Sequence, residues 1–174
     1  MKKKLTTGIF SCIAVLLVFG IVIGRNAIGN ILSGRVHFPE DYVGKVIELK
    51  DGQNYRIFRR LQIDGKSENH NDKTIFKVKF RFRNLSPGVN KRFSIIPAPF
   101  LIGMKGFREK VWTINEKTNE FQGIYQWSSK EAAERYPETF IFKLMTKRAT
   151  HGTVSYEIMP DTDIVEYIKA KRIE

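Results

Sequence analysis

The feature that most constrains the fold is an alternating segment that runs from Thr74 to Arg83. Apolar residues occupy every second position and cations the positions between, so that Phe76, Val78, Phe80 and Phe82 alternate with Lys77, Lys79, Arg81 and Arg83. Successive side chains of a β-strand point to opposite faces of its sheet. The segment therefore predicts a strand with one face buried in a core and the other face wholly basic.

The chain from residue 74 to residue 160 predicts an α+β domain. Its expected elements are the strand at 74–83, a short helix around 90–96, strands at 107–114 and 121–127, a helix from 128 to about 149 with a break at Pro137, and a strand at 154–158. This order is that of the ferredoxin-like fold, a four-stranded antiparallel sheet with helices on one face.

Local signals set the ends of these helices. Pro97 and Pro99 keep the first helix short, because proline lacks the amide hydrogen that a helix interior uses. Ser128 and Glu131 form an S-x-x-E capping box, which predicts that the second helix begins at Ser128. Residues 161–174 predict a short amphipathic helix or tail after the domain.

Residues 8–24 form an apolar segment without a charged side chain, and Lys2, Lys3 and Lys4 precede it. As a helix it would span roughly 26 Å, slightly less than the hydrocarbon core of a bilayer. Lysines before such a segment keep the N-terminus in the cytoplasm. We therefore expect residues 1–25 to be a retained single-pass transmembrane helix, a signal-anchor, with the soluble part of the chain on the extracytoplasmic side.

Two other interpretations of this segment stay open. Val22-Ile23-Gly24 before Arg25 is a weak cleavage site, so the segment is also compatible with a secretory signal peptide. Cys12 allows lipidation, although it lies inside the apolar run and does not follow it. A cleaved signal peptide would also leave the remaining chain outside the cytoplasm.

Residues 26–73 predict a stalk followed by a β-hairpin. The hairpin covers residues 45–66, and Asp51-Gly52 is a strong turn signal between its two strand-like runs. The polar segment at 67–73 marks the boundary before the alternating strand.

The net charge is +12, and the N-terminal lysines account for only three of these charges. Such an excess favours acidic partners, which are anionic lipid headgroups or an anionic small molecule. Nucleic acid is not expected, because the phenylalanines and cations of the alternating strand lie on opposite faces and cannot bind one strand of bases together.

Metal-dependent and nucleophilic chemistry find little support in the sequence. The histidines stand far apart, at His37, His70 and His151, and the single cysteine, Cys12, lies in the apolar segment. Neither a glycine-rich phosphate loop nor a G-x-S-x-G motif is present. We therefore expect no metal and no cofactor.

The stretch GFREKVWTINEKTNEFQGIYQWSSKEAAERY, residues 106–136, resembles the YdhR-type mono-oxygenase-like proteins of the dimeric α+β barrel superfamily. The matching features are a Gly-Phe entry, Lys-Val-Trp-Thr on one strand, Gly-Ile-Tyr on the next, and an acidic, alanine-bearing helix. The resemblance extends over about residues 74–158. Two departures are the absence of histidine in 128–149, where haem-degrading relatives would carry a ligand, and the prolines after Ser94 in the first helix.

The resemblance implies a homodimer whose two sheets face each other and enclose a cavity in each subunit. Some members of this superfamily oxidise aromatic polyketides without metal or cofactor, others degrade haem, and others have no known substrate. In such a barrel the cations of the alternating strand would point inward, where they need acidic partners or an anionic ligand. The alternative is that this face is solvated or meets lipid headgroups, as in a non-catalytic membrane-surface or partner-binding module.

Aromatic side chains on the next two strands predict walls for a flat ligand, although aromatic residues at strand spacing are also common in plain cores. Arg108, Lys110 and Trp112 share one strand face, and Phe121, Gly123, Tyr125 and Trp127 share another. Trp112, Tyr125 and Arg81 would position a substrate. No general base is evident, because Glu109 points to the other face of its strand. The candidate ligand-binding residues are Lys79, Arg81, Arg108, Trp112, Tyr125 and Trp127.

Overall fold

A computed structural model describes residues 20–49, 51–65, 73–83 and 86–172. A helix covers residues 20–32, and the further elements, in chain order, are β1 (Val36–His37), β2 (Val46–Glu48), β3 (Asn54–Ile63), β4 (Thr74–Phe80), α2 (Pro87–Phe93), α3 (Ala98–Gly103), β5 (Phe107–Asn115), β6 (Glu120–Trp127), α4 (Lys130–Arg135), the 3-10 turn η1 (Tyr136–Glu138), α5 (Phe140–Lys147), β7 (Ser155–Met159) and α6 (Ile164–Lys171).

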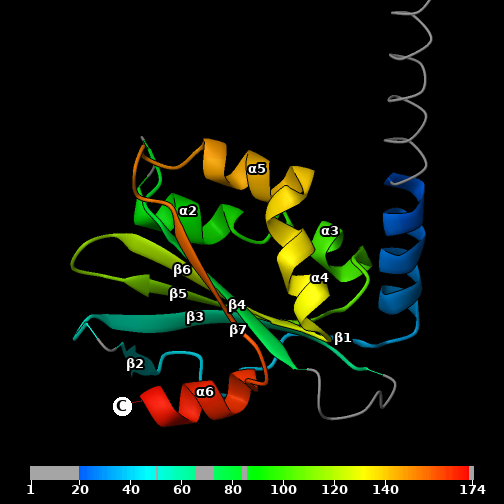
Figure 1. The fold of residues 1–174 in the computed structure, drawn as a ribbon, viewed down its shortest axis with the longest axis horizontal. Coiled ribbons are helices and arrows are strands. Elements are labelled where there is room, and N and C mark those ends of the chain that lie inside the picture. The colour runs from blue at the N-terminus through cyan, green and yellow to red at the C-terminus, as the bar shows by residue number, and fades with distance from the viewer. Residues whose placement is uncertain (1–19, 50, 66–72, 84–85, 173–174) are drawn as a thin grey trace, which may run out of the picture.

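The strands form one antiparallel sheet of seven strands in the order β1-β3-β5-β6-β4-β7, with β2 also paired to β3. Strands β5, β6, β4 and β7 have the ferredoxin-like order, so this part of the prediction is confirmed. The expectation of a four-stranded sheet is wrong. The first hairpin adds its long strand β3 to the edge of β5, and β1 and β2 then extend the sheet along β3 (Figure 1).

The sheet is covered on both faces, although helices were expected on one face only. Helices α2, α3, α4 and α5 lie on one side of the sheet, and α6 lies on the other (Figure 1). The face under α2–α5 carries Phe76, Val78 and Phe80 in a large aromatic core. On the opposite face, Ile75, Val111 and Ile124 pack with β2 and with Ile164 and Ile168 of α6.

The alternation in β4 therefore does not separate a buried face from a solvent-exposed face, because both faces of the strand are covered. Phe76 and Val78 are fully buried, as expected, and the strand ends at Phe80, three residues earlier than predicted. The lysines between them lie on the α6 side and are partnered within the chain. Lys77 forms an ion pair of 2.7 Å with Glu157, and Lys79 one of 3.2 Å with Asp51. Neither lysine needs an external anion to balance its charge.

Proline and capping residues explain the helix ends. Pro87 opens α2, which overlaps the helix predicted around 90–96, and Pro97 is the N-cap of α3, a second short helix that the sequence analysis did not predict. The cap of α4 is Ser129, whose side chain accepts from the Ala132 amide, and not Ser128. The Ser128 amide instead donates to the Gly106 carbonyl at 2.8 Å. Thr139 caps α5 after the break at Pro137.

The expected anchor lies mostly outside the described residues, which begin at residue 20. Among the residues that the structure describes, no helix is both long enough and apolar enough to cross a membrane. The predicted division of the chain at residues 25, 73 and 160 stays a prediction, and so does the homodimer.

The helix at 20–32 is fixed to the domain through α3. Ile23 and Ala27 are buried, and the side-chain amides of Asn26 and Asn30 donate to the carbonyls of Gly103 and Ile102 at 3.3 and 2.9 Å. Glycine is required at position 103, because an added Cβ would collide with the Ile23 carbonyl oxygen. The contact is thus a backbone-to-backbone approach of two helices.

We expect Gly103→Ala to release the helix at 20–32 from α3, at a cost of about 1–3 kcal/mol. Hydrogen exchange followed by mass spectrometry would then show lost protection in residues 20–32. The control is Gly29→Ala, because nothing lies within 4 Å of that position and alanine is the better helix former. Retained protection in Gly103→Ala would contradict this packing.

Candidate functional site

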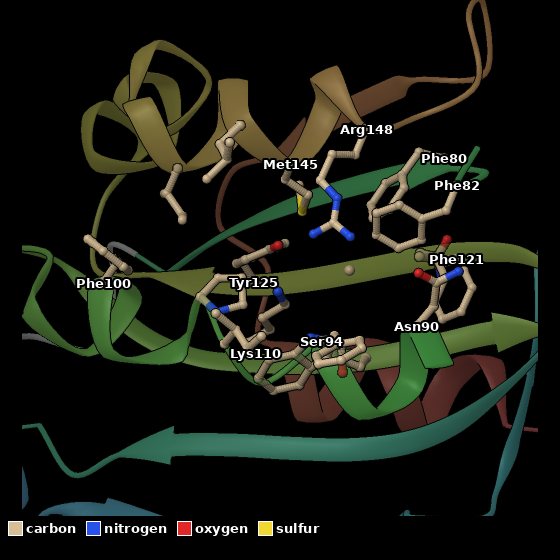
Figure 2. A pocket seen from close by; sticks show the side chains of 18 residues that line it. Phe80, Phe82, Asn90, Ser94, Phe100, Lys110, Phe121, Tyr125, Met145 and Arg148 are labelled. Atoms are coloured by element: carbon tan, nitrogen blue, oxygen red, sulfur yellow. The ribbon is translucent and has the colours of Figure 1, made fainter. Parts of the chain in front are cut away.

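A cavity of about 140 Å³ lies between the sheet and the helices α2, α3 and α5 (Figure 2). Strands β4, β5 and β6 form its sheet side, through residues such as Phe80, Lys110 and Tyr125. The helices contribute the opposite side and the mouth. The cavity is therefore on the helical side of the sheet, and not on the side that the basic face of β4 indicated.

Aromatic rings make most of the sheet side of this cavity. Trp112, Phe121 and Tyr125 come from neighbouring strands, and Gly123 stands directly opposite Trp112 in the β5–β6 register. The Tyr125 ring lies over Gly123, so that an added Cβ would be 2.7 Å from a ring carbon. The absence of a side chain at position 123 thus lets Tyr125 lie against the sheet.

Lys110 places an ammonium group in these aromatic surroundings. The residue is 3% exposed, and its Nζ lies 4.3 Å from the centre of the Trp112 ring and 4.5 Å from the centre of the Tyr125 ring. It forms no hydrogen bond or ion pair with the residues that the structure describes. Two ring faces stabilise a cation, but they do not replace the water that burial removes.

Burial lowers the pKa of Lys110 well below its ordinary value, and the positive charge of nearby Arg59 lowers it further. Both effects disfavour the charged form. Lys110 is therefore a buried amine that binds its proton weakly. Such an amine can act as a general base, or it can be protonated when an anionic ligand binds beside it.

Two arginines add positive charge near the cavity. Arg59 donates to the Ser94 hydroxyl at 2.6 Å, and its guanidinium lies 5.9 Å from the Trp112 ring centre, behind the cavity wall. Arg148 extends from the end of α5 into the mouth, with its guanidinium 5.8 Å from the centre of the Phe82 ring (Figure 2). Among the described residues that line the cavity, none is acidic. The electrostatics therefore favour an anionic or acidic ligand.

A pair of tyrosines supports the inner end of the cavity. The Tyr136 hydroxyl donates to the Tyr125 hydroxyl at 3.2 Å, and both side chains are buried. Burial raises the pKa of both phenols, so both hydroxyls keep their protons. Tyr125 can therefore donate its own hydrogen to a ligand while Tyr136 holds its ring in place.

The predicted ligand-binding residues divide into two groups. Trp112 and Tyr125 line this cavity together with Lys110. Trp127 instead lines a groove between α4 and the helix at 20–32, and Lys79 lines a depression beside α6. The side chain of Arg108 does not line the cavity. It lies beside Gly65, 3.5 Å from the position that a Cβ atom on that glycine would occupy. Arg81 is exposed after the end of β4.

Sequence reasoning placed Lys110 on the same strand face as Trp112 but gave it no chemical role. Its burial depends on α2 and α3, which pack over the strand and whose positions the strand pattern does not contain. Glu109, the carboxylate considered as a base, lies on the other face as expected and receives two hydrogen bonds from Arg60, at 3.0 and 2.7 Å. No cluster of three potential metal-ligating His, Cys, Asp or Glu residues occurs in the described part of the chain.

Residues 75–160 match the family described as putative mono-oxygenase ydhR. No curated protein sequence matches the chain at a significant level. The matched segment begins in β4 and ends just after β7, so it covers the ferredoxin-like part of the sheet and every residue of the cavity.

Solved structures of similar fold share little sequence with the chain. A major regulator of staphylococcal pathogenesis is 11% identical, with a TM-score of 0.50 over 66% of this chain and 72% of its own. LmHde, a heme-degrading enzyme from Listeria monocytogenes, is 12% identical, with a TM-score of 0.48 over 71% of this chain and 96% of its own. An uncharacterized ferredoxin fold protein from Listeria monocytogenes, related to antibiotic biosynthesis monooxygenases, is 13% identical, with a TM-score of 0.48 over 74% and 94%.

We expect Lys110→Met to stabilise the protein, and to do so more at low pH than at high pH. Because the pKa of Lys110 is lower in the folded than in the unfolded chain, the unfolded chain binds more protons between the two values, and wild-type stability rises with pH there. The difference in unfolding free energy between variant and wild type should shrink by about 1.4 kcal/mol per pH unit in this window.

Urea unfolding of both proteins across this window, up to the unperturbed lysine pKa of about 10.4, measures the difference. Lys117→Met, in the exposed β5–β6 turn, is the control and should give a constant difference from wild type. A Lys110→Met effect that is equally independent of pH would show that the amine is not buried.

Proposed function

We propose, on the premise that residues 75–160 have a ydhR-type mono-oxygenase-like fold, that the cavity binds a small aromatic compound with an acidic hydroxyl group and that Lys110 removes the proton of that group. The observation that carries this proposal is a buried amine that lies between two aromatic rings and has no ion-pair partner among the described residues, in a cavity whose described lining contains no carboxylate. The aromatic walls take up the rings of the ligand, and the amine supplies a polar contact that orients it.

Proton transfer from the ligand to Lys110 would give the site one positive and one negative charge in contact. The hydroxyl proton moves from the ligand oxygen to Lys110 Nζ, which leaves a ligand anion beside a new ammonium group. A buried anion and cation in contact compensate each other's lost hydration, which neither could do alone. The Trp112 and Tyr125 rings stabilise the ammonium further. An acidic ligand thus complements the charge and the hydrogen-bonding capacity of the site.

The same step prepares oxidation. Deprotonation makes an aromatic compound electron-rich, and such an anion can react with dioxygen without metal or cofactor. For a substrate with a ring methylene group, the CH₂ carbon and O₂ give a C=O group and one molecule of water, and the substrate supplies the electrons. The role of the chain is to orient the substrate, take its proton and keep water away, and mono-oxygenase-like oxidation of a bound anion is the activity that we propose.

1-Naphthol is a suitable probe of the first step, because its anion absorbs at longer wavelength than the neutral form. We expect wild-type protein to bind it with the spectrum of the anion at a pH where free naphthol is neutral. Lys110→Met should lose that band and bind about 10–100-fold more weakly, which corresponds to one charge-assisted hydrogen bond.

Two controls isolate the amine. 1-Methoxynaphthalene has no proton to give, so Lys110→Met should change its affinity little. Lys79→Ala combined with Arg81→Ala should leave the naphtholate band intact, because neither side chain lines the cavity. Equal naphtholate bands in wild type and Lys110→Met would refute the role of Lys110. Oxygen consumption with hydroxylated aromatic compounds would then test oxidation.

The location of the protein is proposed from the sequence. Apolar residues 8–24 after three lysines support a single-pass membrane tether, with the N-terminus in the cytoplasm and the cavity on the other side. We expect the chain to sediment with membranes, to keep an intact N-terminal mass, and to be digested by protease added to spheroplasts. A soluble product that lacks the first residues would show cleavage instead.

A further inference from the structure

The mouth of the cavity is surrounded by exposed apolar side chains. Phe93, Ile96, Phe100 and Leu144 line the cavity and are 44–60% exposed. Phe140 of α5, next to the cavity residue Ile141, is 68% exposed. Folded proteins seldom leave several large apolar side chains together in water unless the surface meets a partner.

The elements that carry this apolar rim are uniformly basic. Residues 86–107 and 139–156 contain Lys91, Arg92, Lys105, Lys143, Lys147 and Arg148, and neither segment contains an aspartate or glutamate. The α6 side of the sheet is different, because there Lys77 and Lys79 are paired with carboxylates. Of the six cations, Lys91 forms an ion pair of 3.6 Å with Glu116, and the other five form none with the residues that the structure describes. An apolar surface surrounded by cations that are mostly unpaired complements an anionic membrane surface, where the rings enter the interface and the cations meet headgroups.

The path of the chain brings the apolar N-terminal segment to the same side. The helix at 20–32 begins on the side of the sheet where α5 lies and ends near β1 (Figure 1). Residues 8–19, which precede this helix, are apolar and contain no charged side chain. Because Gly103 and Ile23 fix the helix against α3, residue 20, at which the described chain begins, lies on the side of the helical layer and not on that of α6.

We infer that the mouth of the cavity lies against the surface of a bilayer that contains anionic lipid, and that the ligand enters the cavity from the lipid phase. This rests on the proposed function, and it narrows the ligand to lipophilic hydroxylated aromatic compounds that dissolve in membranes. The apolar rim provides a path from the acyl chains to Lys110 that does not pass through water.

Fluorescent labels on single cysteines test this orientation in the full chain. In a Cys12→Ser background, Ile96→Cys and Phe140→Cys place a label on the rim, and Lys169→Cys places one on the exposed surface of α6. Each protein is bound to phosphatidylcholine vesicles that contain about 30% phosphatidylglycerol, which gives them a negative surface potential, and a spin-labelled lipid that quenches near the headgroups. All three proteins keep the same tether, so only the orientation of the domain differs between labels.

Labels at residues 96 and 140 should be quenched at least about threefold more than the label at residue 169. Equal quenching at the three positions would show a domain that tumbles on its tether and would overturn the inference, as would stronger quenching at residue 169 or none at all.

Charge reversal tests the basic rim. Lys143→Glu with Lys147→Glu should remove most of the quenching at residue 96, whereas Lys169→Glu with Lys171→Glu, the matched pair on α6, should not. Unchanged quenching in the first pair would refute the electrostatic contact. Naphthol titration of the unlabelled wild-type chain without vesicles separates the two proposals. A naphtholate band in that chain, without quenching of the rim labels, rejects only the membrane contact. A missing band, with quenching of the rim labels, rejects only the ligand site.

Discussion

The structure depends on one constraint, which is that the central strands β4, β5 and β6 carry large apolar side chains on both faces. A sheet of this kind cannot leave either face in water, because each exposed face would forfeit the hydrophobic stabilisation of its side chains. Helices α2–α5 cover one face and α6 with β2 covers the other. The two layers then acquire different roles. On the α6 side, Ile75, Val111 and Ile124 are packed under α6 and β2, and Lys77 and Lys79 are paired with carboxylates. The other layer is built of large rings that leave a cavity.

That cavity is chemically distinctive because a lysine was placed where a core would have an apolar residue. Lys110 occupies the same strand face as Trp112 and Ile114, both of which belong to the aromatic core. A buried cation without a partner lowers stability, and proteins keep such groups mainly where they serve binding or catalysis. The cost at Lys110 is reduced by the two rings beside it and by its low proton affinity. Removal of the charge is therefore expected to stabilise the fold and to weaken ligand binding. Such opposite effects on stability and on binding are typical of functional residues.

The sequence predicted those features that local patterns encode and missed those that arise from packing between distant elements. The two-residue period gave β4, and the turn at Asp51-Gly52 gave the β2–β3 hairpin. The pairing of β3 with β5 joins residues about fifty positions apart, and no local signal specifies it. For the same reason the sequence left open whether acidic side chains, a ligand or solvent balances the basic face of β4, since nothing in it places Glu157 and Asp51 beside Lys77 and Lys79. The capping residue was displaced by one, because Ser128 and Ser129 offer equivalent side chains and only the hydrogen bond to Gly106 decides between them.

The glycine at position 123 has a consequence for the energetics of recognition. The Tyr125 ring packs against the backbone at Gly123, and its hydroxyl accepts a hydrogen bond from Tyr136, so two contacts hold the floor of the cavity in place. Side chains held in this way keep the same positions with and without a ligand. A ligand therefore does not have to displace them when it binds. Preorganisation of the host spares the entropy that an adaptable site would lose on complex formation. Selectivity should accordingly follow the shape of the guest, with flat ring systems accepted and bulky, three-dimensional molecules of equal polarity rejected.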